Sequence, residues 1–266
     1  MKNIILCADD YGQSAAISAG ILLLVQQQRL SAVSCLSESE HWPQAGAELR
    51  DWREHIDVGL HFNLTHAFPG QAIPAAALGA ILRSAVDGSI DRRAIATALH
   101  AQLDRFEAVL QGPPDFVDGH QHVHVLPGIR SVFLAELARR YRDRKPYLRA
   151  VAPRLRLDAT LAKTIVLKLL GTGFTAALRR AGFTANGGFG GIYSLRPEEN
   201  YAALMQIWLA AARSGDLLMC HPGNAASDAS DPIAATRPLE LKFLSSPEFA
   251  TLLQRNAVQL SRFRGR

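Results

Sequence analysis

The sequence predicts an α/β fold in which parallel strands form an irregular TIM-like (β/α) barrel. Short apolar runs alternate with longer segments of helical spacing, a pattern typical of a parallel sheet covered by helices. Several of these runs end in aspartate or histidine, and a barrel gathers the carboxyl ends of its strands on one face. The 266 residues, 48% of them hydrophobic, suffice for one large core. We therefore predict about seven parallel strands in a single domain spanning residues 1–266.

The predicted strands are short apolar runs bounded by polar or turn-forming residues. They cover residues 3–8, 32–36, 56–62, 114–117, 147–152 and 216–223. The helices follow from apolar residues three and four positions apart. They cover about residues 14–28, 42–52, 91–110, 127–142, 158–181, 198–214 and 246–260. Ser14 is suited to cap the first helix, Pro127 and Gly128 open the fourth, and the glycine-rich residues 186–191 form a flexible loop.

Charge and cysteine content exclude some classes of protein. The net charge of +5 is concentrated between Arg154 and Arg180, without the basic, aromatic-containing stripe typical of nucleic-acid-binding proteins. The three cysteines lie far apart in apolar runs, which indicates buried thiols in a reducing compartment. The apolar run 4–8 is shorter than the roughly 7–15 residues of a signal-peptide core, and no run reaches the roughly 20 residues that span a bilayer. We expect a cytoplasmic protein.

A stretch with three histidines and an aspartate dominates the candidate site. Asp118, His120, His122 and His124 follow the strand predicted at 114–117. Imidazole nitrogens and carboxylate oxygens bind divalent cations, and α/β folds hold ligands where strands give way to helices. On an extended backbone, the alternate spacing would place all three histidines on one side. We predict a metal centre, with Asp118 orienting a histidine; a polar pocket without metal is the alternative.

Other predicted strands end in similar residues. Asp9 and Asp10 follow the first strand, where one carboxylate can bind an ion while the other takes a proton; capping of the next helix is an equal alternative. His61 alone is a weak signal, because a single histidine that ends a buried strand is often a core residue. His221 suits a general acid, or a buried histidine bonded to backbone. Arg149 has three interpretations: a pair with Asp9, a substrate contact or a structural ion pair. We expect four further histidines to be solvated: His41, His55, His66 and His100.

Four segments stand in a characteristic order: ADDYG at 8–12, GLH at 59–61, DGHQHVH at 118–124 and CHP at 220–222. Together they resemble the YdjC-like carbohydrate deacetylases, which include chitooligosaccharide deacetylases and deacetylases of hopanoid biosynthesis. The resemblance extends to RPLEL at 237–241 and covers nearly the whole chain. One departure is Gly119, where serine is usual, and it removes no ligand.

The resemblance implies hydrolysis of an N-acetyl group from an amino sugar in an irregular α/β barrel with one divalent metal ion and no other cofactor. By the family pattern, Asp10, His61 and His120 hold the metal. Asp9 is the base that activates water, and His221 is the acid. The candidates for supporting ligands or contacting substrate are Asp118, His122, His124, Arg149 and Glu240. Two histidine ligands favour Zn²⁺ or another transition ion, whereas oxygen ligation suits Mg²⁺, so both metals stay open.

The basic segment 154–191 is predicted to be a helical and loop insertion near the substrate site. Its apolar residues stand among lysines and arginines, and its last loop looks closer to the hopanoid-type members. We therefore expect a lipid-linked N-acetyl sugar and a peripheral contact with the inner face of the membrane. An oligosaccharide substrate, with an ordinary core-facing helix that has a solvated basic face, is an equal alternative. The sequence leaves a homodimer open.

Two other functions stay open beside the deacetylase. One is a metal-dependent phosphoesterase or another amidohydrolase, although the sequence has neither a second carboxylate-rich cluster nor a glycine-rich phosphate loop. The other is a non-catalytic sugar-binding protein, for which replacement of Asp9 would leave binding intact. Release of acetate, release of phosphate or binding without turnover distinguishes these functions.

Overall fold

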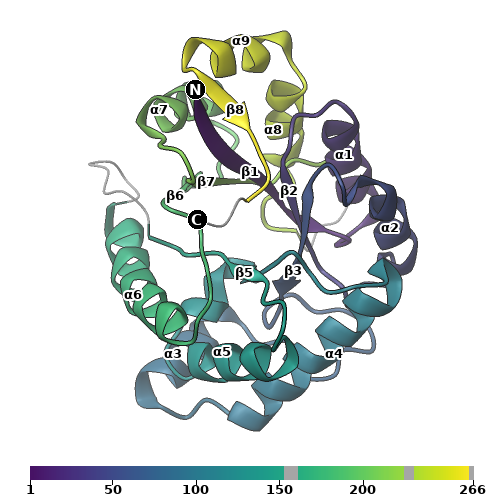
Figure 1. The fold of residues 1–266 in the computed structure, drawn as a ribbon, viewed down its shortest axis with the longest axis vertical. Helices are drawn as coiled ribbons and strands as arrows, with labels where there is room; N and C mark the ends of the chain where they lie inside the picture. Colours follow the sequence, from purple (N-terminus) through teal and green to yellow (C-terminus); the bar gives the residue numbers. More distant parts are fainter. Residues whose placement is uncertain (153–160, 225–230, 264–266) are drawn as a thin grey trace.

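The computed structural model describes residues 1–152, 161–224 and 231–263, and within these ranges parallel strands form one curled sheet (Figure 1). The strands are β1 (Lys2–Tyr11), β2 (Ala32–Cys35), β3 (Asp57–Phe62), β4 (Phe116–Gly119), β5 (Tyr147–Leu148), β6 (Phe189–Gly190), β7 (Leu217–Cys220) and β8 (Val258–Leu260). Their order is β5-β4-β3-β2-β1-β7-β6, and β8 pairs with the beginning of β1.

Helices lie around the outside of this sheet (Figure 1). They are α1 (Ala15–Gln26), α2 (Trp42–Leu49), α3 (Leu78–Asp87), α4 (Arg92–Leu110), α5 (Ile129–Arg140), α6 (Leu161–Arg180), α7 (Tyr201–Ala211), α8 (Arg237–Leu244) and α9 (Pro247–Arg255), with short 3-10 turns η1 (Arg50–Trp52) and η2 (His120–Val125). Because helices cover the sheet, the residues of β2, β3, β4 and β7 are all buried. No helix in the described ranges is long and apolar enough to cross a membrane.

The two ends of the sheet approach one another through the chain segment that leads into β6. Leu148 in β5 forms an isolated parallel bridge with Ala185, and Phe189 in β6 pairs with Leu217 in β7. One short stretch of chain therefore contacts both β5 and β7, and the sheet curls. The prediction of an irregular α/β barrel with about seven parallel strands in a single domain is confirmed.

Three predicted elements differ from the structure. The strand predicted at 147–152 is reduced to β5, Tyr147–Leu148. The predicted loop 186–191 contains β6, because Phe189 packs into the core and its backbone pairs with β7. The predicted helix 246–260 ends at Arg255, and Val258 begins β8, which pairs with β1. The apolar residues of 258–260 belong to a short strand. The spacing of apolar residues did not show where the helix ends and this strand begins.

Parallel pairing places the carboxyl ends of β1, β3, β4 and β7 at one end of the barrel. The register sets Asp118 opposite His61 and Ala8 opposite Cys220. Since Asp9 and Asp10 follow Ala8, and His221 follows Cys220, the polar residues at these strand ends come together. The three cysteines are buried and free, as predicted.

Candidate metal centre

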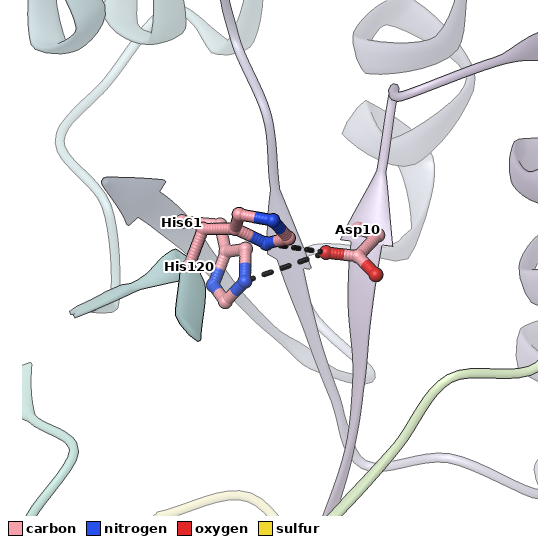
Figure 2. Close-up of side chains that lie close together, drawn as sticks. All are labelled: Asp10, His61 and His120. Atoms are coloured by element: carbon pink, nitrogen blue, oxygen red, sulfur yellow. Dashed lines mark hydrogen bonds and ion pairs between the residues drawn. The ribbon is translucent and has the colours of Figure 1, made fainter. Parts of the chain in front are cut away.

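Side chains at three strand ends converge on one point. Figure 2 shows Asp10 of β1 facing His61 of β3 and His120, which follows β4. Oδ1 of Asp10 lies 3.5 Å from Nε2 of His61 and 3.1 Å from Nδ1 of His120. Bonds of about 2.1 Å to one cation separate neighbouring ligand atoms by roughly 3.0–3.4 Å, so the spacing of these atoms fits a single divalent ion.

Asp9 and Asp10 both line the cavity because β1 loses its regular alternation there. Asp10 has a φ of 70°, a left-handed conformation that residues other than glycine rarely adopt. The register between β1 and β2 shifts between Ala8 and Tyr11, and the N–H of Gln13 donates to the Asp10 carbonyl oxygen at 3.0 Å. Neighbouring side chains of a regular strand point to opposite faces, whereas this turn brings both carboxylates to one cavity.

Asp118 holds the ring of His61. Nδ1–H of His61 donates to Oδ1 of Asp118 at 2.6 Å, and the Ser34 hydroxyl donates to the same oxygen at 2.7 Å. Burial alone would lower the pKa of His61, but the nearby carboxylates, that of Asp118 above all, outweigh burial and raise it. Nε2 of His61 is left facing Asp10. Asp118 therefore fixes the orientation of the His61 ring, and its role in supporting a metal ligand stays a prediction.

Arg149 pairs with Asp9. Its Nη1 and Nη2 donate to the two carboxylate oxygens of Asp9, each at 2.6 Å, and Nη2 also lies 2.6 Å from Oδ2 of Asp118. Burial would raise the pKa of Asp9, but the guanidinium outweighs burial and holds that pKa well below its usual value. Arg149 is fully buried and lies behind the cavity wall. Of its three interpretations, the structure favours the pair with Asp9 over a substrate contact.

His221 lines the cavity beside Asp9. Its Nε2 lies 3.9 Å from Oδ2 of Asp9, and its backbone N–H donates to Oε2 of Glu240 at 2.6 Å. Glu240 also accepts a hydrogen bond from the hydroxyl of Tyr193 and is fully buried. Glu240 thus supports the backbone of His221 and does not line the cavity.

The cavity has a volume of about 700 Å³, a polar floor and a largely aliphatic wall. The floor includes Asp9, Asp10, His61, His120 and His221. The wall includes Leu78 and Leu82 from α3, Val125 at the end of η2 and Leu126 directly after it, Leu170 from α6, and the loop residues Leu195 and Ile233. Among the described lining residues none is Phe, Tyr or Trp. A polar group held at the floor would therefore have apolar surface around it.

A family model for YdjC-like proteins matches residues 3–255, nearly the whole chain. The chain belongs to the YdjC-like protein family. This YdjC-like protein is similar to the chitooligosaccharide deacetylases of Yersinia pestis (strain Pestoides F) and Yersinia pseudotuberculosis serotype O:1b (strain IP 31758). Each is 34% identical over 140 residues, which cover 50% of this chain and 55% of the relative. The chain spans about half the length of the curated relatives it matches.

Solved structures share the fold at low sequence identity. A protein of Enterococcus faecalis V583, whose description refers to cellobiose-phosphate cleavage, has a TM-score of 0.73 at 17% identity, over 98% of this chain and 97% of that chain. A family 4 acetyl xylan esterase from Clostridium thermocellum, in complex with a cobalt ion, has a TM-score of 0.51 at 11% identity, over 98% of this chain and 88% of that chain. These likenesses show a common fold.

The prediction that His120, His122 and His124 lie on one side is wrong. They belong to η2, where Gln121 and His122 have φ angles of 52° and 61° and turn the chain. His122 lines the cavity, but His124 is fully buried and its Nε2–H donates to the Arg149 carbonyl oxygen at 3.0 Å. Burial lowers the pKa of His124 to about 4. His124 is therefore part of the core of this YdjC-like protein.

Gly119, the departure from the family pattern, lies against His124. A Cβ atom at position 119 would be 2.8 Å from Nδ1 of His124 and 3.1 Å from its backbone nitrogen. Glycine therefore leaves room for the buried ring in this YdjC-like protein.

Sequence reasoning gave no place in the cavity to Arg237 or His66, which both line it. Arg237 donates through Nη2 to Oδ2 of Asp10 at 2.9 Å, a contact between residues 227 positions apart. His66, which we expected to be solvated, lines the cavity with its ring centroid 6.3 Å from that of His120. The RPLEL segment at 237–241 drew attention to Arg237, but the sequence did not indicate that Arg237 contacts Asp10. His66 carried no signal, because a single histidine in a loop is usually exposed.

Proposed function

We propose that this protein is a metal-dependent carbohydrate N-deacetylase that removes an acetyl group from an N-acetylated amino sugar and releases acetate. The observation that carries the proposal is the convergence of Asp10, His61 and His120 on one point, next to Asp9 and His221 in the same cavity. The name of the Yersinia relatives supports this reaction. The acetyl xylan esterase with its cobalt ion supports a divalent metal in this fold.

Asp10, His61 and His120 would hold the ion. Two nitrogen donors and one oxygen donor suit Zn²⁺ or another transition ion better than Mg²⁺, which prefers oxygen ligands throughout. A bound divalent cation would supply a Lewis acid for the amide carbonyl and lower the pKa of a water at an open coordination position. Asp118 would keep Nε2 of His61 directed at the ion by fixing its Nδ1–H.

Asp9 and His221 would move the protons of the reaction. The carboxylate of Asp9, kept ionised by Arg149, accepts a proton from the attacking water, whose oxygen joins the acetyl carbon. The bond between that carbon and the sugar nitrogen then breaks, and protonated His221 gives its proton to the departing amine. Nε2 of His221 lies 3.9 Å from Oδ2 of Asp9, so both groups could reach one bound amide.

We further propose that the sugar carries an apolar group, as in a lipid-linked substrate. The support is the aliphatic cavity wall. The helices α3 and α6, which contribute Leu82 and Leu170 to this wall, also expose Val86 (89%) and Leu169 (72%). Apolar surface around a polar site favours a ligand with an apolar part. The same exposed side chains support the expected peripheral contact with a membrane.

Acetate release from N-acetylglucosamine oligomers and from an N-acetylglucosaminide tests the function. We expect release by the metal-loaded protein, loss of release after chelation, and recovery when a divalent ion is returned. Release of phosphate from phosphate esters instead would indicate a phosphoesterase. Sugar binding without turnover, unchanged by Asp9→Asn, would indicate a binding protein.

The apolar group is tested with octyl and methyl glycosides of the same sugar. We expect a lower KM for the octyl glycoside, and Leu82→Asn should raise KM for that glycoside alone. Leu23→Asn on α1, where Leu23 is exposed to a similar extent away from the cavity, is the matched control. Equal KM values for both glycosides would contradict the lipid-linked substrate while leaving deacetylation intact.

A further inference from the structure

Arg237, the first residue of α8, connects Asp10 to a second buried carboxylate. Its Nη2 donates to Oδ2 of Asp10 at 2.9 Å, and its Nε donates to Oδ2 of Asp231 at 2.6 Å. Arg237 is 1% exposed, so this contact is made away from water. One carboxylate oxygen of Asp10 is therefore held by a buried guanidinium.

Glu240, one helical turn further along α8, holds the end of β7. Its two carboxylate oxygens accept from the backbone N–H of His221 and from the hydroxyl of Tyr193. Residues three positions apart lie on one face of a helix, so Arg237 and Glu240 project from α8 toward neighbouring strand ends. Gly223 fits closely beside this turn, since a Cβ there would lie 3.2 Å from Cδ of Arg237.

We propose that the first turn of α8 is a positioning element that sets the metal ligand Asp10 and the proton donor His221 relative to each other. The proposal rests on the proposed function. Arg237 occupies Oδ2 of Asp10, which leaves Oδ1 directed at the two histidines. Glu240 fixes the backbone of His221, so that the imidazole keeps its distance from Asp9. Glu240 does not line the cavity, and Arg237 acts on the site through its contact with Asp10.

Asp10 needs such a partner because its backbone is strained. A φ of 70° at a residue other than glycine is unfavourable and persists only where surrounding contacts hold it. Without Arg237, the carboxylate can rotate and present both oxygens to the cation. The contact with Arg237 therefore selects single-oxygen ligation by Asp10.

Metal affinity and the visible spectrum of the Co²⁺-loaded protein test the role of Arg237 without any substrate. Arg237→Gln should weaken Co²⁺ binding by about 10–100-fold, in competition with a chromophoric chelator, and should shift the spectrum. Arg237→Lys keeps the charge and should recover part of the affinity. Because Arg237→Gln leaves Asp231 buried without its partner, Arg237→Gln/Asp231→Asn provides a second variant with the same expected loss.

Substitutions at Glu240 test the other part of the proposal, the positioning of His221. Glu240→Ala should lower kcat for acetate release about tenfold or more, with KM and Co²⁺ affinity unchanged, and Glu240→Gln should restore most of kcat because its amide oxygen can still accept from His221. Arg262→Gln is the control for removing an arginine that pairs with a buried aspartate away from the cavity, since the half-buried Arg262 contacts the buried Asp57 at 2.8 Å at the amino end of β3. It should leave Co²⁺ affinity and spectrum unchanged.

The outcomes separate this inference from the proposed function. Wild-type affinity and spectrum in both Arg237→Gln variants, with acetate still released by the wild type, would overturn the positioning role alone. Equal Co²⁺ losses in Arg237→Gln and Arg262→Gln would also overturn it, since that result indicates general destabilisation. Absence of metal binding by the wild type would overturn the proposed function and this inference together.

Discussion

Asp9 and Asp10 are adjacent, buried and each paired with an arginine, yet their surroundings give them different chemistry. Arg149 donates to both oxygens of Asp9, whereas Arg237 donates to one oxygen of Asp10. The other oxygen of Asp10 faces the two histidines of the candidate metal centre, while Asp9 faces His221. In the proposed function, the geometry of the arginine, rather than the residue type, therefore separates the metal ligand Asp10 from the proton acceptor Asp9.

The largest expected effect comes from removing either carboxylate. Asp9→Asn should lower acetate release by about a hundredfold to ten-thousandfold, the usual contribution of a general base, while the metal content is unchanged. Asp10→Asn should lose the metal as well as the activity, because it removes a ligand. Acetate release and elemental analysis of both variants measure this contrast. Loss of metal in both variants to the same extent would break the distinction between the two aspartates.

Removing Arg149, the arginine that pairs with Asp9, should mainly lower the free energy of unfolding. Arg149→Met leaves Asp9 and Asp118 buried without their cation, which should lower the free energy of unfolding by about 3–5 kcal/mol. Arg139→Met is the control, because Arg139 pairs with Glu136 on the surface and such pairs contribute less than about 1 kcal/mol. Urea unfolding measures both. A similarly small decrease in the free energy of unfolding of both variants would show that Arg149 does not stabilise the buried charges of Asp9 and Asp118.

A smaller effect concerns His124, which lies in the core beneath Arg149. Its pKa falls from 6.5 to about 4 on burial. The unfolded chain therefore binds more protons than the folded protein between these values, and stability falls as pH drops from 6.5 to 4. The loss from this residue is on the order of 3 kcal/mol.

His124→Phe removes that titration, so its free energy of unfolding should depend less on pH than that of the wild type. Urea unfolding between pH 7 and pH 4 gives both curves. Parallel curves would mean that His124 is protonated in the folded state, and that the core on the Asp9 side is more polar than its contacts indicate.

The strand ends were predictable because they depend on one general rule. Parallel pairing places the carboxyl ends of strands at one edge, so the apolar runs that end near Asp10, His61 and His221 bring these residues together. The register of β3 with β4 places Asp118 beside His61. The motif resemblance supplied their roles. The sequence therefore predicted the barrel and the residues that converge in it.

The remaining parts of the site depend on backbone conformation and distant contacts. The positive φ angles at Gln121 and His122 separate the three histidines, and nothing in the residue types required that turn. The contact of Arg237 with Asp10 joins opposite ends of the chain, where local spacing carries no information. Asp158 and the residues next to it fall in 153–160, outside the described residues, whereas Leu170 of the predicted insertion does line the cavity.

X-ray absorption spectroscopy of the protein loaded with one equivalent of Zn²⁺ or Co²⁺ tests the central claim most directly. We predict two imidazole nitrogens and a carboxylate oxygen around a single ion, with one nitrogen lost in His61→Ala and the oxygen lost in Asp10→Asn. A spectrum without imidazole ligands, or one that neither substitution changes, would contradict a metal centre formed by Asp10, His61 and His120.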